Sequence, residues 1–149
     1  MSDAETTPRP GERLVPLLKR MGHRLFALHA AALDPFGIDV RDLGAMLVID
    51  GSEPSSQQEI AARMGVDRTT MVALLDGLEV KGILARRPDP GDRRRNVVEL
   101  TTTGASLLRE ATAASDRAEA ELLSGLSAEE GAQLRGLMAR VVDRDVSER

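Results

Sequence analysis

The sequence contains no cysteine, and this absence removes several kinds of chemistry from consideration. A chain of 149 residues without thiols has no disulfide, no cysteine nucleophile, no thiol redox sensor and no cysteine-ligated zinc. Its two histidines, His23 and His29, are six positions apart and do not share a helix face as an i, i+4 metal-binding pair would. We therefore expect neither a metal ion nor another cofactor.

Aromatic residues are nearly absent as well, since Phe26 and Phe36 are the only two. Proteins bind single-stranded nucleic acids largely by stacking bases on aromatic side chains. The composition therefore disfavours RNA-recognition sheets and other single-strand binders.

Long apolar runs and known catalytic motifs are also missing. No stretch approaches the roughly 20 apolar residues that cross a bilayer, and the polar N-terminus does not read as a secretory signal, so we expect a cytoplasmic protein. The chain has no P-loop, dinucleotide fingerprint, HExxH or G-x-S-x-G motif. Its titratable residues fall mainly on helix caps and solvent-facing positions, so we do not expect an enzyme.

What the chain does have is an unusual concentration of arginine. The formal net charge is -4, yet residues 55–101 carry a net charge of +1 and the remainder carries -5. Five arginines fall in the stretch ARRPDPGDRRRNVVELT, residues 85–101. Like charges at this spacing repel one another, which suggests a polyanionic partner.

The periodicity of apolar residues predicts six helices and two short strands in the order α-α-α-α-β-β-α-α. Capping boxes at Asp39, Ser56 and Ser127 mark three helix starts, and Gly65 with Asp67 marks a four-residue turn between two helices. The predicted helices cover residues 12 to about 33, 39–50, 56–64, 68–81, 101–124 and 127 to about 145, with strands at 83–88 and 95–101.

Two short helices joined by a tight turn and followed by a hairpin indicate a helix-turn-helix with a wing. The predicted fold class is therefore mainly α (α+β), a winged helix-turn-helix flanked by N- and C-terminal helices that form a dimerisation subdomain. We expect a disordered tail at 1–11, helices for dimerisation and core support at 12–52, the DNA-binding winged helix at 53–101 and dimerisation helices at 102–149.

From Gln57 to Leu108 the sequence resembles the MarR family of bacterial winged-helix transcription regulators. The resemblance rests on QQEIAARMGVDRTTMVALLDGLEVKGILARRPDPGDRRRNVVELTTTGASLL, which includes an Asp-Arg-Arg wing signature followed by LTTTG. It covers about a third of the chain with specific motifs, while the flanking helices agree in number and length. The resemblance implies a homodimer that binds a pseudo-palindromic operator in double-stranded DNA, most often as a repressor, and a small-molecule effector.

The residues of the predicted recognition helix, 68–81, favour the same function. Its inward face carries Met71, Leu74, Leu75 and Leu78, which leaves the opposite face for DNA. The helix N-terminus offers N–H groups to a phosphate, hydroxyl side chains add phosphate contacts, and an arginine can reach a guanine edge. The candidate DNA-binding residues of this helix are Arg68, Thr69, Thr70, Val72 and Ala73.

Ala73 stands where the family often has a larger polar side chain, so we expect specificity to rest more on DNA shape than on base contacts. In the wing, Pro90-Gly91 predicts a type II turn that projects the arginines at its tip towards a minor groove. Asp92 is placed to orient the guanidinium of Arg94, which the resemblance assigns as the groove residue. The candidate wing residues are Arg86, Arg87, Asp92, Arg93, Arg94 and Arg95.

Two further expectations concern the flanking helices. They carry more apolar area than one small winged helix needs, which favours a twofold dimer over a purely monomeric core. The resemblance implies an effector pocket between the dimerisation helices and the winged helix, with Met21, Arg24, Leu25, His29 and Met46 as candidate lining residues. One alternative function stays open, a winged-helix adaptor that binds proteins and not DNA.

Overall fold

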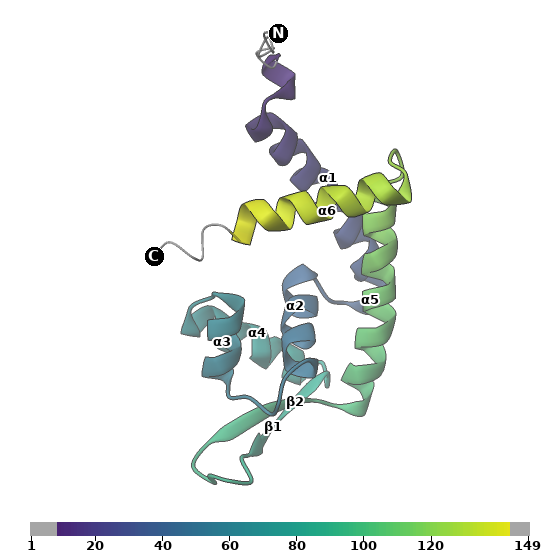
Figure 1. Ribbon diagram of the computed structural model, residues 1–149. Coiled ribbons are helices and arrows are strands. Elements are labelled where there is room, and N and C mark those ends of the chain that lie inside the picture. The colour runs from purple at the N-terminus through teal and green to yellow at the C-terminus, as the bar shows by residue number, and fades with distance from the viewer. Residues whose placement is uncertain (1–8, 144–149) are drawn as a thin grey trace. The chain divides into compact units, whose positions relative to one another are not determined.

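The computed structural model describes residues 9–143, which separate into two compact units (Figure 1). Residues 29–116 form one unit, which we call the winged-helix unit. Residues 9–28 and 117–143 belong to the other, which we call the terminal-helix unit. The helices α1 (Leu14–Leu33) and α5 (Thr102–Leu122) each contribute to both units.

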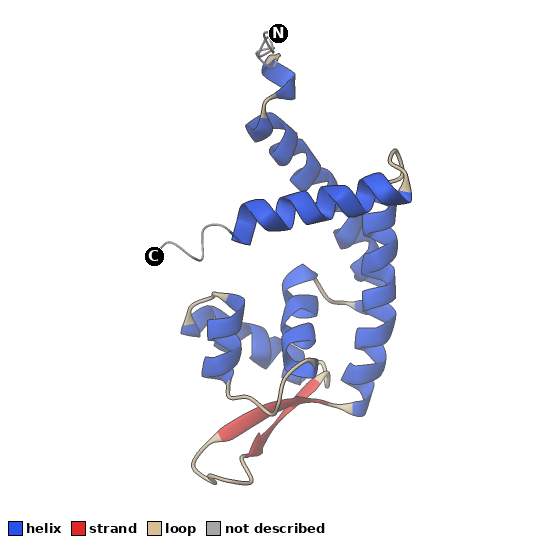
Figure 2. Cartoon of the chain, in the orientation of Figure 1, coloured by secondary structure: helices blue, strands red, loops and turns tan. Residues whose placement is uncertain are grey.

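The winged-helix unit has the predicted order of elements and confirms the predicted fold class (Figure 2). After the 3-10 turn η2 (Asp34–Phe36) come the helices α2 (Val40–Asp50), α3 (Gln57–Met64) and α4 (Arg68–Val80). Two antiparallel strands follow, β1 (Leu84–Pro88) and β2 (Asn96–Leu100), and α5 then begins.

Local capping sets the helix boundaries as the sequence predicted. The Asp39 carboxylate accepts hydrogen bonds from the first turn of α2, and Ser56 and Glu59 form a reciprocal capping box on α3. Gly65 ends α3 at a φ of 64°, the left-handed conformation that glycine adopts without steric cost. Asp67 caps α4, so the turn between α3 and α4 is fixed at both ends.

The core of this unit lies between α2, α4, the sheet and α5. Met46, Ile60, Leu75 and Leu78 are fully buried within it, and the inward face predicted for α4 is confirmed at Met71, Leu75 and Leu78. Leu74 is only half-buried at the edge of the core. Burial of this apolar area supplies the main driving force that holds the helix-turn-helix against the wing.

The two strands pair along their whole length. The register runs from Leu84 with Leu100 at the base to Pro88 with Asn96 beside the turn, and Ser55 adds an isolated bridge because its carbonyl accepts the Val98 amide at 2.9 Å. The start of α5 is tied to the same end, since the Thr101 hydroxyl donates to the Gly82 carbonyl and accepts the Gly104 amide.

The terminal-helix unit contains the 3-10 turn η1 (Pro10–Glu12), the first part of α1, the end of α5 and α6 (Ala128–Asp143). The capping box predicted at Ser127 is confirmed by its reciprocal bonds with Glu130. Many large apolar side chains of this unit stay exposed in the single chain, on α1 at Leu14, Val15, Leu17, Leu18 and Phe26 and on α6 at Leu137, Met138, Val141 and Val142.

Parts of two predictions lie outside the described residues, namely positions 1–8 of the expected tail and 144–149 of the last helix. The functional division of the chain stays a prediction, although α2 packs with the winged-helix unit. Among residues 9–143, no helix is long and apolar enough to cross a membrane.

Candidate nucleic-acid interface

The first turn of α4 presents polar groups to solvent on a well-capped helix end. The Asp67 carboxylate accepts the Thr70 amide at 2.9 Å and the Thr70 hydroxyl at 2.6 Å. These hydrogen bonds lower the pKa of Asp67, with the Thr70 hydroxyl as the largest cause. Because that hydroxyl already donates to Asp67, it has no proton left to donate to a phosphate while the cap is intact.

Three of the remaining candidates on α4, Arg68, Thr69 and Ala73, are exposed as the sequence predicted. Val72, also expected on the outward face, is half-buried. Asp76, one turn further along, is also exposed and carries a negative charge on the same helix. The accessible donors of this surface are therefore concentrated in its first turn.

The turn of the wing is built differently from the prediction. Gly91 does not adopt a positive φ, since the described glycines that do so are Gly37, Gly65 and Gly82, so the type II turn is wrong. Instead the Asp89 carboxylate accepts the Gly91 amide at 2.8 Å, and the Asp89 amide donates to the Arg95 carbonyl. Side-chain capping by aspartate shapes this turn, as Asx turns do.

Asp92 acts on the backbone. Its Oδ1 accepts the Arg94 amide at 3.0 Å, and its carbonyl accepts the Arg95 amide at 2.9 Å. No ion pair joins Asp92 to Arg94 within residues 9–143, so the expected pairing of carboxylate and guanidinium is replaced by a backbone turn. The side chains of Arg93 and Arg94 are exposed, and neither forms an ion pair with a described residue.

The other three wing arginines have carboxylate partners inside the protein. Arg86 on β1 pairs with Asp76 at 2.6 Å and with Glu79, both on α4. Arg87 pairs across the hairpin with Glu99 at 3.5 Å.

Arg95 completes this pattern. Its Nη2 lies 2.5 Å from Glu59 Oε2 on α3, and its Nε lies 3.8 Å from Asp89. The bond from Arg95 is the largest cause that lowers the pKa of Glu59, and the same bond raises the pKa of Arg95. Both groups therefore stay charged at neutral pH.

A cavity of about 990 Å³, which we call the α3–wing cavity, separates α3 and the start of α4 from the wing. Besides Arg68, Arg86 and Arg95, its polar lining includes Gln57 and Gln58 at the start of α3 and Asn96 at the start of β2. The sequence reasoning missed these three amides. The Ser56 capping box marks the N-terminus of α3, but only the folded chain shows that this end faces the wing.

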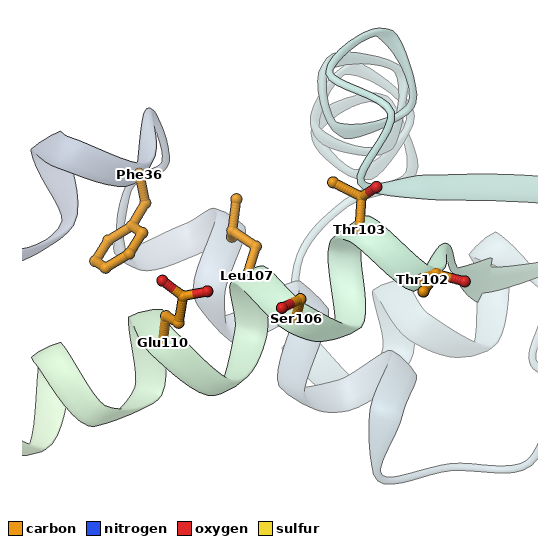
Figure 3. Close-up of a pocket in the computed structure, with 6 residues that line it drawn as sticks. All are labelled: Phe36, Thr102, Thr103, Ser106, Leu107 and Glu110. Carbon is orange, nitrogen blue, oxygen red and sulfur yellow. The ribbon is translucent and has the colours of Figure 1, made fainter.

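A second, shallower hollow of about 490 Å³ lies beside the first turns of α5 (Figure 3). It is lined by Phe36, Thr102, Thr103, Ser106, Leu107 and Glu110, and Figure 3 shows the Phe36 ring near Glu110 and Leu107. Its only charged lining group is the Glu110 carboxylate.

The five candidate effector residues line neither of these two cavities. Met46 is fully buried in the core, and His29 is buried with its Nε2 2.9 Å from the Ser115 hydroxyl. Met21 and Leu25 are half-buried, and Arg24 is exposed. Within residues 9–143, no cluster of three or more histidine or carboxylate side chains is arranged to hold a metal ion.

Comparison with known proteins places this geometry among DNA-associated regulators. The sequence profile of the MarR family matches residues 36–95, which include α2, α3, α4, β1 and the wing turn. The structure of the transcriptional repressor CouR bound to a 23-mer DNA duplex is 29% identical with a TM-score of 0.81, covering 89% of this chain and 94% of that one.

Two further solved structures show the same fold. CouR from Rhodococcus jostii RHA1 bound to p-coumaroyl-CoA is 29% identical with a TM-score of 0.76, covering 91% of this chain and 95% of that chain. A MarR family protein of Mycobacterium tuberculosis in complex with DNA is 27% identical with a TM-score of 0.75, covering 87% and 97%. The profile match, the element order and these likenesses agree: the chain is similar to the MarR family of winged-helix transcription regulators, in sequence over residues 36–95 and in fold over most of its length.

Proposed function

We propose that this protein binds double-stranded DNA as a homodimeric transcription regulator, acts as a repressor, and is released from DNA by a small-molecule ligand. The observation that carries the proposal is the pair of exposed wing arginines, Arg93 and Arg94, on the same unit as the exposed first turn of α4. Two of the similar structures are bound to DNA, which supports the same partner here. The similarity to MarR-family proteins, which are transcription regulators, supports a regulator and not an enzyme.

In this proposal α4 enters a major groove by its N-terminal turn. Arg68 binds a guanine edge or a phosphate, and Thr69 binds a phosphate beside the helix N-terminus. Val72 contacts a thymine methyl, and the small Ala73 leaves part of the specificity to DNA shape. Thr70 contributes through the Asp67 cap that orients this turn.

The wing supplies the second point of contact. Arg94 enters an adjacent minor groove, where narrow A·T-rich segments attract arginine, and Arg93 binds the neighbouring backbone. Asp92 holds the turn that presents both residues, through its bond to the Arg94 amide. Between wing and helix, the amides of Gln57 and Gln58 donate to the phosphates of the strand that passes the α3–wing cavity.

The exposed apolar residues of α1 and α6 support a homodimer. A monomer seldom leaves so many large apolar side chains in water on two helices, and burying them against a second copy gains hydrophobic free energy. A twofold dimer would present two α4 helices to half-sites about one helical turn apart, which matches a pseudo-palindromic operator.

A ligand-bound relative supports a small-molecule effector. CouR from Rhodococcus jostii RHA1 has been solved with p-coumaroyl-CoA, and an anionic aromatic ligand of that chemical class is the first candidate here. Met21, Arg24, Leu25, His29 and Met46 stay the predicted lining of the effector site, with Arg24 as the exposed cation. We place the protein in the cytoplasm, where a regulator meets DNA.

The test of the DNA function is fluorescence anisotropy on a duplex from the region upstream of the gene, beside a random duplex of the same length, at several salt concentrations. Tight, salt-dependent and sequence-selective binding is the expected result. Equal, weak binding to both duplexes would point to a distant operator or to the protein adaptor. Selection of bound fragments from the whole genome separates these two, because an adaptor enriches none.

A further inference from the structure

Both arms of the wing hairpin are joined to the helix-turn-helix by ion pairs, and each arm is joined to a different helix. On β1, Arg86 donates to Asp76 and Glu79 of α4. Just before β2, Arg95 donates to Glu59 of α3. The wing is therefore joined to the helices at two places, in the middle of β1 and beside the turn.

Arg86 has little capacity left for another partner, and Arg95 is engaged at one end. The Arg86 side chain is only 21% exposed, and its two terminal nitrogens bind two different carboxylates. Arg95 bonds to Glu59 by Nη2 and has Asp89 near Nε. A guanidinium presents five N–H donors in a fixed fork, so engaging both terminal nitrogens of Arg86 removes the geometry that would grip a phosphate.

The carboxylates that pair with these arginines lie on the surface proposed to bind DNA, where negative charge is unexpected. Glu59 lies on the wall of the α3–wing cavity, and Asp76 lies on the exposed side of the recognition helix. Unpaired, each would repel phosphates. Paired with a wing arginine, each is neutralised and fixes the wing at the same time.

We propose that Arg86 and Arg95 are positioning residues that fasten the wing to α4 and α3 through Asp76, Glu79 and Glu59, and so set the direction of Arg93 and Arg94. The effect of this fastening on DNA binding rests on the proposed function, whereas its effect on the orientation of the wing does not. The proposal separates the wing arginines into two that hold the wing, Arg86 and Arg95, and two that meet DNA.

The decisive variant is Glu59→Gln. Glutamine at this position keeps the capping box, since either residue can bond back to the Ser56 amide, and removes only the charge that holds Arg95. Glu130→Gln is the matched control, because Glu130 occupies the same position in the Ser127 capping box of α6.

The first readout is amide hydrogen exchange of the free protein. Asp89 and Arg95 report on the wing turn, because their amides bond to the carbonyls of Arg95 and Asp92. We expect faster exchange at both amides in Glu59→Gln and no change in Glu130→Gln. Unchanged exchange at both amides would overturn the fastening role, whether or not the protein binds DNA.

The second readout is DNA affinity, where two physical effects have opposite signs. Removing a negative charge from the DNA-facing surface should tighten binding by electrostatics alone. Loss of the fastening should weaken binding to the upstream duplex by about two- to fivefold, the range of an exposed ion pair, with the salt slope kept. Equal or tighter binding by Glu59→Gln would overturn the proposal.

A second variant tests the other tie. Asp76→Asn with Glu79→Gln releases Arg86 and should also weaken binding, although it removes two negative charges from the recognition helix. If both variants loosen the wing but wild-type protein binds no DNA, the fastening stands and the DNA function falls. If wild type binds DNA and neither variant changes amide exchange or affinity, the DNA function stands and the fastening role is wrong.

Discussion

At the scale of single residues, the wing arginines differ in what their guanidinium groups meet. Arg86, Arg87 and Arg95 each have a carboxylate of the protein within 4 Å, whereas Arg93 and Arg94 are exposed at the tip. Exposed ion pairs contribute little to stability, with a typical value of about 0–1 kcal/mol each. We infer that they serve to orient the wing, because Arg86 and Arg95 connect the two-stranded hairpin to α4 and α3.

Arg94→Ala should weaken DNA binding without unfolding the protein. Loss of one phosphate contact lowers the salt slope by about one unit, and loss of a groove contact removes about 1–3 kcal/mol of discrimination. Anisotropy titrations at several salt concentrations measure both. Arg109→Ala, which removes the same charge from the exposed side of α5, is the control and should leave the slope unchanged. Full affinity in Arg94→Ala would contradict the role of the tip.

The Glu59–Arg95 pair should give a defined pH dependence. Because Arg95 lowers the pKa of Glu59 below its ordinary value of 4.5, the ionised carboxylate stabilises the folded state at neutral pH. This stabilisation is lost as the pH falls below 4.5 and through the lowered pKa. Urea unfolding of wild type and Glu59→Gln should therefore differ at pH 7 and converge in acid.

The same comparison in an Arg95→Gln background isolates the cause. Without Arg95 the largest reason for the lowered pKa is gone, so Glu59→Gln should have a smaller pH-dependent effect there. An unchanged pH dependence in that background would assign the effect to the Ser56 cap instead of the ion pair.

The sequence located the arginines of the wing but could not separate their tasks. Which carboxylate faces Arg95 depends on a contact with Glu59, 36 positions away, and no local rule specifies such a contact. Asp92 was expected to orient the Arg94 guanidinium, but its carboxylate bonds to the Arg94 backbone amide instead. Aspartate competes for backbone donors in this way whenever a turn leaves them free, and the sequence alone does not decide between the two partners.

At the scale of elements, local rules of helix capping predicted more of the structure correctly. Asp39, Ser56, Asp67 and Ser127 each cap a helix where predicted, because a capping hydroxyl or carboxylate needs only the N–H groups of the next turn. The α3–wing cavity could not be foreseen, since it depends on how two helices and a hairpin pack. The structure also explains the glycine of the LTTTG motif, which the sequence left without a physical reason.

Gly104→Ala should strongly destabilise the winged-helix unit. A Cβ at this position would lie 1.9 Å from the Ile83 carbonyl oxygen, against backbone that cannot move aside without breaking the Thr101 bonds. We expect a loss of at least about 3 kcal/mol, at the upper end for overpacking, measured by urea unfolding.

Gly136→Ala in α6 is the matched control for this substitution. A Cβ there meets nothing within 4 Å, and alanine in a helix interior gains about 0.5–1 kcal/mol over glycine. A mild effect of Gly104→Ala, comparable in size to that of Gly136→Ala, would show that α5 can shift away from the Ile83 backbone.

At the scale of the whole molecule, we expect the exposed apolar residues to determine the oligomeric state of the protein in solution. The winged-helix unit buries a complete core of its own, whereas α1 and α6 leave large side chains exposed. Specific interfaces bury about 1,200–2,000 Å² in total, an area that two helices from each of two copies can provide. The same dimer would make two α4 helices act together on one duplex.

Leu137→Glu with Val141→Glu should therefore give a monomer. The two side chains are 53% and 73% exposed in the single chain and stand four residues apart, so two charges would fall on one face of α6. Sedimentation at micromolar concentration measures the change of mass. Affinity for the upstream duplex should fall by about 10²–10⁴-fold, because the two half-sites would no longer be bound together.

Leu47→Glu provides the control for this pair of substitutions, since Leu47 is similarly exposed at 47% but lies on α2 in the winged-helix unit. It should stay dimeric. If the α6 variant remains a dimer, the interface lies elsewhere on the chain. If wild type is itself a monomer and still binds DNA tightly, each winged helix recognises its site alone, and the paired half-site arrangement is wrong.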